Sequence, residues 1–295
     1  MVWLSIALAS PEVVSSTADE KRLDQRISDE PADLVILYGG EQDGQLGTCG
    51  CPGDPKGSLG RVESWRDRAA ERNEPVLLVN VGNWLTDPVG VGNALHPSAF
   101  RRNAAMLDAV TNWDALNVSF RDLPYLGTVD EGWPAGVVSA NASGLPDVVS
   151  AEVNGRSIAI VGVTAWKKDY LQPEGVERID PIEALETLLP TLEQDLVVVL
   201  SYGLGKRNKA ITALDVDVLI DGDTHRSNVP ALVVDDTVWV RSRFETQYLG
   251  ELRLQLDDDG VTYAHDRAIS MDRRIPTSKK WRKKLRETQK AMESI

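Results

Sequence analysis

Short runs of Val, Ile and Leu recur along the chain, and Gly, Pro or Asp bounds each of them. The runs occupy residues 33–38, 75–80, 157–163, 195–200, 216–220 and 231–234. Strands that are apolar at almost every position are buried on both faces, as in sheets that helices cover. This feature restricts the chain to an architecture in which sheets and helices form layers.

Segments with the periodicity of amphipathic helices lie between these runs. Residues 59–72, 99–111 and 181–193 each carry apolar residues three and four positions apart, which is the spacing of one helix face. Pro181 directly follows Asp180, a favourable pairing of an N-cap with a proline in the first turn. The alternation of strands and helices predicts an α/β layered domain.

After residue 229 the pattern changes to the alternation of apolar and polar residues that is typical of strands. The alternating segments are residues 238–240, 248–256 and 261–265, with a polar turn at 257–260. We predict an antiparallel hairpin that closes the fold at its C-terminal end. The chain then divides into an N-terminal segment or signal remnant at 1–30, one domain at 31–270, and a basic helix or tail at 271–295.

The charge of the chain is unevenly distributed. The formal net charge is -13, but residues 272–295 carry nine Lys or Arg against three acids, so the tail is +6 and the rest -19. An acidic body repels the phosphates of nucleic acids, so we expect no nucleic-acid partner. The tail could bind an acidic protein partner or a membrane surface, or form a solvated terminal helix. No stretch approaches the roughly 18 apolar residues of a membrane span.

The two cysteines, Cys49 and Cys51, stand one residue apart. They cannot form a disulfide framework or a four-ligand zinc site by themselves. Four interpretations of the two cysteines stay open: a reactive or metal-binding dithiol, a structural turn, a local disulfide in an exported protein, and a metal site shared with His225.

Polar residues follow five of the predicted strands. They occupy residues 41–44, 80–83, 117–122, 201–203 and 221–225. In α/β sheets, ligands bind beyond the carboxyl ends of the strands. One such loop would be an ordinary turn, but five in order indicate a functional site.

Taken in order, these loops resemble the motifs of metallophosphoesterases related to the 5′-nucleotidases. The matching segments are Glu41 to Gly44, Asn80 to Asn83, Val118 to Asp122, Ser201 with Tyr202, and Gly222 to His225. The resemblance spans roughly residues 33–256 and implies two central β-sheets flanked by helices. It also favours a periplasmic or otherwise exported location over a cytoplasmic one.

The resemblance implies a mechanism with two metal ions about 4 Å apart. Carried over to this chain, the first metal would be held by Glu41, Asp43, Asn83 and His225, a set that suits a single Mg, Mn or Ca ion. The second falls on Asn83, Phe120, Tyr202 and Asp223. Phenylalanine has no lone pair, and an amide is a poor bridge between two dications. We therefore predict that the second metal is absent, and that the cofactor is one divalent metal or none.

The residues left for chemistry or ligand binding are Arg121 and Asp122. Arg121 stands where the family has a histidine, and guanidinium cannot act as a general acid, although it can bind an anion. The leading hypothesis is a non-catalytic binding or scaffold protein, with a small phosphorylated ligand as one candidate. One alternative is a hydrolase of phosphate esters or nucleotides that uses a single metal. Another is a subunit of a larger exported assembly.

Overall fold

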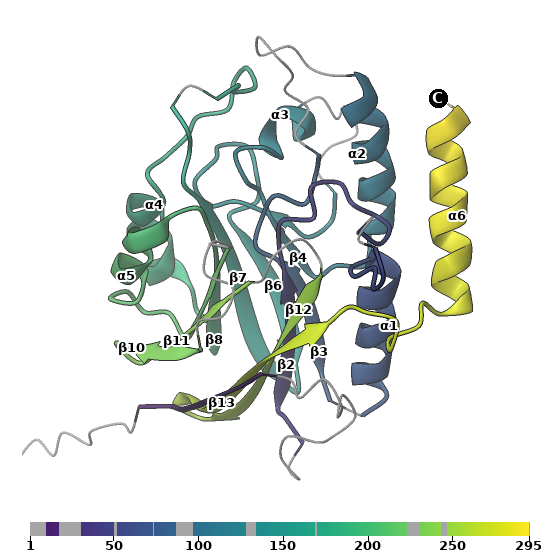
Figure 1. The fold of residues 1–295 in the computed structure, drawn as a ribbon. Coiled ribbons are helices and arrows are strands. Elements are labelled where there is room, and N and C mark those ends of the chain that lie inside the picture. The colour runs from purple at the N-terminus through teal and green to yellow at the C-terminus, as the bar shows by residue number, and fades with distance from the viewer. Residues whose placement is uncertain are drawn as a thin grey trace, which may run out of the picture.

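The computed structural model places two β-sheets face to face, with helices on both outer sides (Figure 1). It describes residues 10–17, 31–49, 52–72, 74–86, 97–127, 134–168, 170–222, 230–242 and 247–294. The predicted α/β layered fold is confirmed, with four layers in the order helix, sheet, sheet, helix.

The first sheet has seven strands in the order β1-β13-β12-β2-β3-β4-β5. Their bounds are β1 Glu12–Thr17, β13 Gly260–Ser270, β12 Tyr248–Asp257, β2 Leu34–Gly39, β3 Val76–Asn80, β4 Ala115–Asn117 and β5 Val137–Val138. Strands β2 to β5 are parallel, whereas β12 pairs antiparallel with both β2 and β13. The predicted closing hairpin is therefore β12–β13. β1 pairs with β13, so part of the predicted N-terminal segment is an edge strand.

The second sheet has six strands in the order β10-β11-β9-β8-β7-β6. Their bounds are β10 Leu232–Val234, β11 Thr237–Arg241, β9 Val218–Asp221, β8 Leu196–Tyr202, β7 Arg156–Thr164 and β6 Val148–Val153. Strands β7, β8, β9 and β11 are parallel, and the edge strands β6 and β10 are antiparallel to their neighbours.

The described helices include the three predicted amphipathic segments and the predicted basic tail, together with two short helices that were not predicted from the sequence. They are α1 Leu59–Ala70, α2 Pro97–Ala109, α3 Leu123–Leu126, α4 Pro181–Leu188, α5 Asn208–Ile211 and α6 Lys279–Ser294, with 3₁₀ turns η2 Leu189–Thr191 and η3 Gly205–Arg207. Asp180 caps α4 as predicted, since its carboxylate accepts from the N–H groups of Ile182 and Glu183. None of the described helices is both long and apolar enough to cross a bilayer.

The buried core forms three layers because each central strand is apolar on both faces. In β2, Val35 and Leu37 pack towards α1 and α2, whereas Ile36 and Tyr38 face the second sheet. A third cluster, which includes Leu185, lies between the second sheet and helices α4 and α5. This burial explains the unbroken apolar runs of the sequence.

Asn117 joins the two sheets where their strands end. Its fully buried amide nitrogen donates to the carbonyls of Val81, Val163 and Leu200, at 2.9, 3.0 and 3.1 Å. These carbonyls belong to the ends of β3, β7 and β8. One side chain therefore fixes the edge at which the polar loops meet.

Candidate functional site

The loops at the carboxyl ends of β2, β3, β4 and β8 converge, as the parallel strand order requires. Glu41, Asp43 and Asn83 all adopt left-handed backbone conformations, with φ of 56°, 47° and 56°. Such conformations are uncommon outside glycine and often occur at functional sites. The N–H of Asp43 donates to the carbonyl of Asn83 at 3.1 Å, which holds the first two loops together.

Both carboxylate oxygens of Glu41 accept hydrogen bonds within the protein. The Tyr202 hydroxyl donates to Oε1 at 2.6 Å, and the Asn83 amide nitrogen donates to Oε2 at 2.6 Å. Burial raises the pKa of Tyr202, and the Glu41 charge beside it adds to the rise. Tyr202 is therefore a neutral donor, and Glu41 accepts from both Tyr202 and Asn83.

Two glycines make room for the Tyr202 ring. A Cβ atom at Gly82 or at Gly222 would lie 2.9 Å from ring atoms of Tyr202, which is closer than side chains can pack. Gly82 also donates its N–H to Asn80 at 2.7 Å, and the Asn80 amide in turn donates to Gln42. Gln42 and Asn80 therefore hold the backbone behind the ring, a role that the sequence did not reveal.

Asp122, a predicted catalytic residue, is fully buried and ties loops together. Its carboxylate accepts from the N–H groups of Asn83, Leu85 and Ser119 at 2.9, 2.8 and 2.8 Å. Burial raises the pKa of Asp122 to about 6, while these hydrogen bonds oppose the rise. Through these contacts Asp122 positions the loops that contain Asn83, Leu85 and Ser119.

An aromatic and cationic cluster lies beside Tyr202. Phe120 packs edge-on against Tyr170, with ring centroids 5.0 Å apart, and lies 6.2 Å from the ring of Tyr202. The Lys167 ammonium lies 4.3 Å from the Phe120 centroid, and the Arg121 guanidinium carbon lies 5.6 Å from it. Two cations therefore stand over one aromatic ring, a favourable arrangement for both.

The loop that carries Lys167 and Tyr170 is held by Arg178. This side chain donates to the carbonyls of Lys167 and Leu171 at 3.1 and 2.8 Å and stacks 5.3 Å from the Trp166 ring. Sequence reasoning missed Lys167 and Tyr170 because their loop follows β7, where no family motif was recognised. The Lys-Lys pair after Trp166 was the one available signal.

The remaining predicted ligands are not brought together by the described residues. Asp43 is exposed, and Asp223 and His225 lie outside the described residues, as does Cys51. The Cys49 sulfur accepts the N–H of Lys56 at 3.3 Å. Within the described ranges, no three His, Cys, Asp or Glu side chains form a group able to hold a metal ion.

Comparisons with known proteins identify the fold. No family model matches the sequence, and no curated protein does. A 5′-nucleotidase precursor from Thermus thermophilus is 18% identical, with a TM-score of 0.71 over 88% of this chain and 59% of that chain. Sulfate thiohydrolase SoxB, also from Thermus thermophilus, is 16% identical, with a TM-score of 0.70 over 90% of this chain and 62% of that one.

A third structure matches over almost its whole length. The calcineurin-like phosphoesterase YfkN from Bacillus subtilis is 17% identical, with a TM-score of 0.65 over 88% of this chain and 98% of that chain. The chain thus spans about three fifths of the length of the first two structures. It has the fold of the calcineurin-like phosphoesterases and 5′-nucleotidases, as the order of its loops predicted.

Proposed function

We propose that this chain, which has the calcineurin-like phosphoesterase fold, is a non-catalytic binding protein whose two-metal centre is dismantled. The observation that carries the proposal is that both carboxylate oxygens of Glu41 already accept hydrogen bonds, one from Tyr202 and one from Asn83. These two short hydrogen bonds already compensate part of the charge of this carboxylate, so its remaining lone pairs attract a cation less strongly.

The described residues at this site do not fit two metal ions. Asn83 turns its amide nitrogen, a donor, towards Glu41, so the position of the bridging carboxylate presents N–H groups instead. Phe120 offers only carbon atoms, and Lys167 and Arg121 bring positive charge to the same ring. Two adjacent dications without an anionic bridge repel each other strongly, and these cations would add to the repulsion.

One observation favours the alternative of a hydrolase that uses a single metal. The Oδ1 atom of Asn83 is buried and has no hydrogen-bond partner among the described residues. Such an atom could ligate one hard cation together with Glu41, Asp43 and His225. Turnover of nucleotides or phosphodiesters that requires Mg²⁺ or Mn²⁺ and disappears in His225→Ala would overturn the non-catalytic proposal.

A small phosphorylated ligand fits the charges that remain at the site. Arg121 is half-buried and Lys167 is exposed, and both stand beside Phe120. Guanidinium binds phosphate oxygens through paired N–H groups, and lysine adds a point charge. We infer that these two cations bind the anionic group without a metal ion.

Arg121→Ala is expected to weaken the binding of phosphate or a nucleoside monophosphate about fivefold to tenfold, because one charge-assisted hydrogen-bonding group is lost. Isothermal titration calorimetry in EDTA measures this without metal. Arg282→Ala, which removes an exposed guanidinium on α6, is the matched control. Equal affinities for Arg121→Ala and the unmodified chain would place the anion elsewhere.

The location and assembly of the protein stay proposals. The resemblance to 5′-nucleotidases supports a periplasmic or otherwise exported location, and fractionation of the source cells would test it. A role as a subunit of a larger exported assembly stays the second alternative, with residues 272–295 as the segment to test. Unchanged recovery of partners after removal of residues 272–295 would reject that role for the tail.

A further inference from the structure

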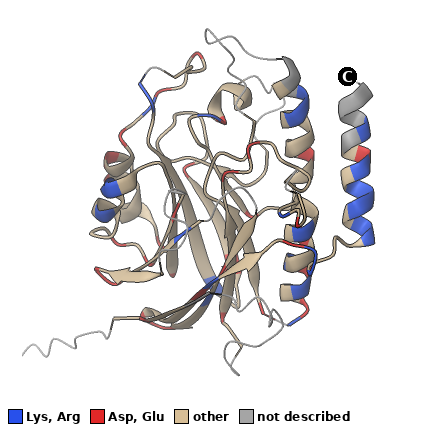
Figure 2. Ribbon diagram, viewed as in Figure 1, with Lys and Arg blue, Asp and Glu red and all other residues tan. Residues whose placement is uncertain are grey.

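One face of the molecule is basic although the chain as a whole is acidic. Helices α1 and α2 cover the outer face of the first sheet, and α6 runs alongside both (Figures 1 and 2). The three helices contain twelve Lys or Arg against five Asp or Glu, a net charge of +7. Because the full chain is at -13, everything outside this three-helix face carries -20.

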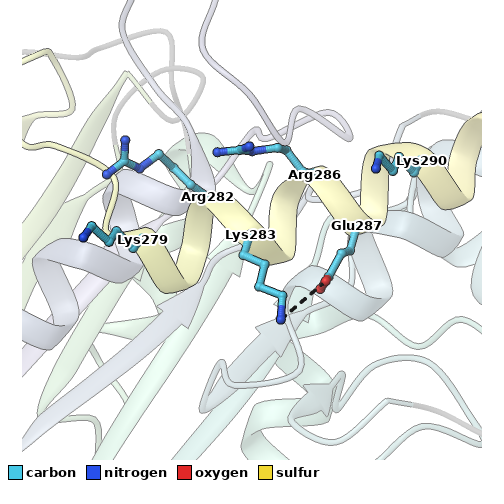
Figure 3. Close-up of a pocket in the computed structure, with 6 residues that line it drawn as sticks. All are labelled: Lys279, Arg282, Lys283, Arg286, Glu287 and Lys290. Atoms are coloured by element: carbon cyan, nitrogen blue, oxygen red, sulfur yellow. Dashed lines mark ion pairs between the residues drawn. The ribbon is translucent and has the colours of Figure 1, made fainter.

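The docking of α6 directs its cations outward. Trp281 and Thr288 are 3% and 5% exposed, and they donate to Asp67 and Asp108 at 3.3 and 3.0 Å. The exposed cations stand on the opposite side of the helix at spacings of three and four residues. They are Lys279, Arg282, Lys283, Arg286 and Lys290, and they line a shallow surface hollow (Figure 3).

These five cations form the α6 stripe, and few acidic side chains beside them neutralise their charge. The acidic side chain in the hollow is Glu287, 3.8 Å from Lys283, and both side chains are more than half exposed. An exposed pair of this kind holds its partners weakly. The stripe therefore presents its positive charge to whatever approaches this face.

Among the side chains that the structure describes on this face, none is a large exposed apolar residue that could anchor a stable protein interface. The exposed large hydrophobic residues of the described chain are Val14, Ile179 and Leu232, and none lies on α1, α2 or α6. Protein–protein interfaces centre on buried apolar or aromatic side chains. A broad, cationic face without such anchors suits many mobile negative charges spread over a plane, which is the character of an anionic lipid surface.

We propose that the three-helix face binds anionic lipid headgroups electrostatically, with the α6 stripe in direct contact. Each Lys or Arg near the headgroups adds to the attraction. Salt screens the repulsion between the acidic remainder of the molecule and the bilayer beyond about 8 to 10 Å. This proposal does not depend on whether the polar loops bind a metal or a phosphorylated ligand.

Co-sedimentation of the full chain with vesicles tests the proposal. We expect binding to vesicles that contain phosphatidylserine in phosphatidylcholine, no binding to phosphatidylcholine alone, and loss of binding as salt rises from about 50 mM to several hundred mM. Arg282→Glu with Arg286→Glu should weaken binding at least tenfold. The control, Lys206→Glu with Lys209→Glu, makes the same change in net charge on the far side of the fold, at exposed positions, and should retain binding.

Two results would overturn the proposal. One is equal loss of binding in the α6 variant and the control, which would reflect net charge rather than this face. The other is binding to an acidic polypeptide such as polyglutamate with none to phosphatidylserine vesicles, which would assign the face to an acidic protein. Unchanged circular dichroism and thermal midpoints would show that both variants are folded.

Discussion

Asn83→Asp is expected to lower the free energy of unfolding by about 3 kcal/mol or more at pH 8. In the unmodified chain the Asn83 amide donates to Glu41 at 2.6 Å, and Asn83 is fully buried. The substitution replaces this donor with a second carboxylate, and two carboxylates at this distance cannot both ionise. The loss should shrink towards pH 5, because one proton shared by the pair restores a hydrogen bond. Urea denaturation at the two pH values measures both effects.

The matched control for Asn83→Asp exchanges the carboxylate and the amide between positions 83 and 41. Combining it with Glu41→Gln places an amide opposite the new carboxylate, and the Gln oxygen can still accept from Tyr202. The double variant should recover most of the lost stability, so the two changes should be strongly non-additive. If Asn83→Asp were as stable as the unmodified chain at pH 8, the contact between Asn83 and Glu41 would be refuted.

Glu63→Gln should make the protein more stable at alkaline pH. Glu63 lies on α1 and is 2% exposed, and burial raises its pKa from 4.5 to about 7 against the opposing charge of Arg66. Stability from this group is fully present below about pH 4.5 and is lost as the pH rises through 7, since the folded state must then hold a buried charge. The advantage of the Gln variant should therefore grow by about 2 to 3 kcal/mol between pH 5 and pH 8.5.

Denaturant titrations at the two pH values, with Glu71→Gln as the control, would measure this difference. Glu71 directly follows α1 and is exposed, so its substitution should change stability little at either pH. The charge of Lys284 on α6 also opposes the rise in the pKa of Glu63. A pH-independent difference between Glu63→Gln and the unmodified chain would mean that Glu63 is not buried as a charge.

Much of the fold could be predicted because burial leaves a direct trace in the sequence. The unbroken apolar runs of β2, β3, β7 and β8 reflect contact with a layer on each face, as expected for strands in sheets that are covered on both sides. The closing hairpin was visible from its alternation and its polar turn. The pairing of β1 with β13 joins residues 251 positions apart, and local patterns contain no information about such contacts.

The site was predictable as a set of loops but not as a set of contacts. The order of the polar segments located Glu41, Asn83 and Tyr202 in one place. Their mutual hydrogen bonds depend on left-handed backbone at Glu41 and Asn83, which ordinary propensities do not predict. Asp122 looked like a reactive carboxylate, since nothing in the sequence shows that three backbone N–H groups surround it.

The most direct test of the account is to count the metal ions that each chain binds. The protein would be loaded with excess Mn²⁺, which thiolates of Cys49 and Cys51 bind less readily than Zn²⁺, then desalted and analysed by mass spectrometry for bound metal. We predict at most one ion per chain, since the site lacks an anionic bridge. Two ions per chain, seen at ordinary coordination distances around Glu41 and Asn83 in a crystal of the loaded protein, would contradict the account.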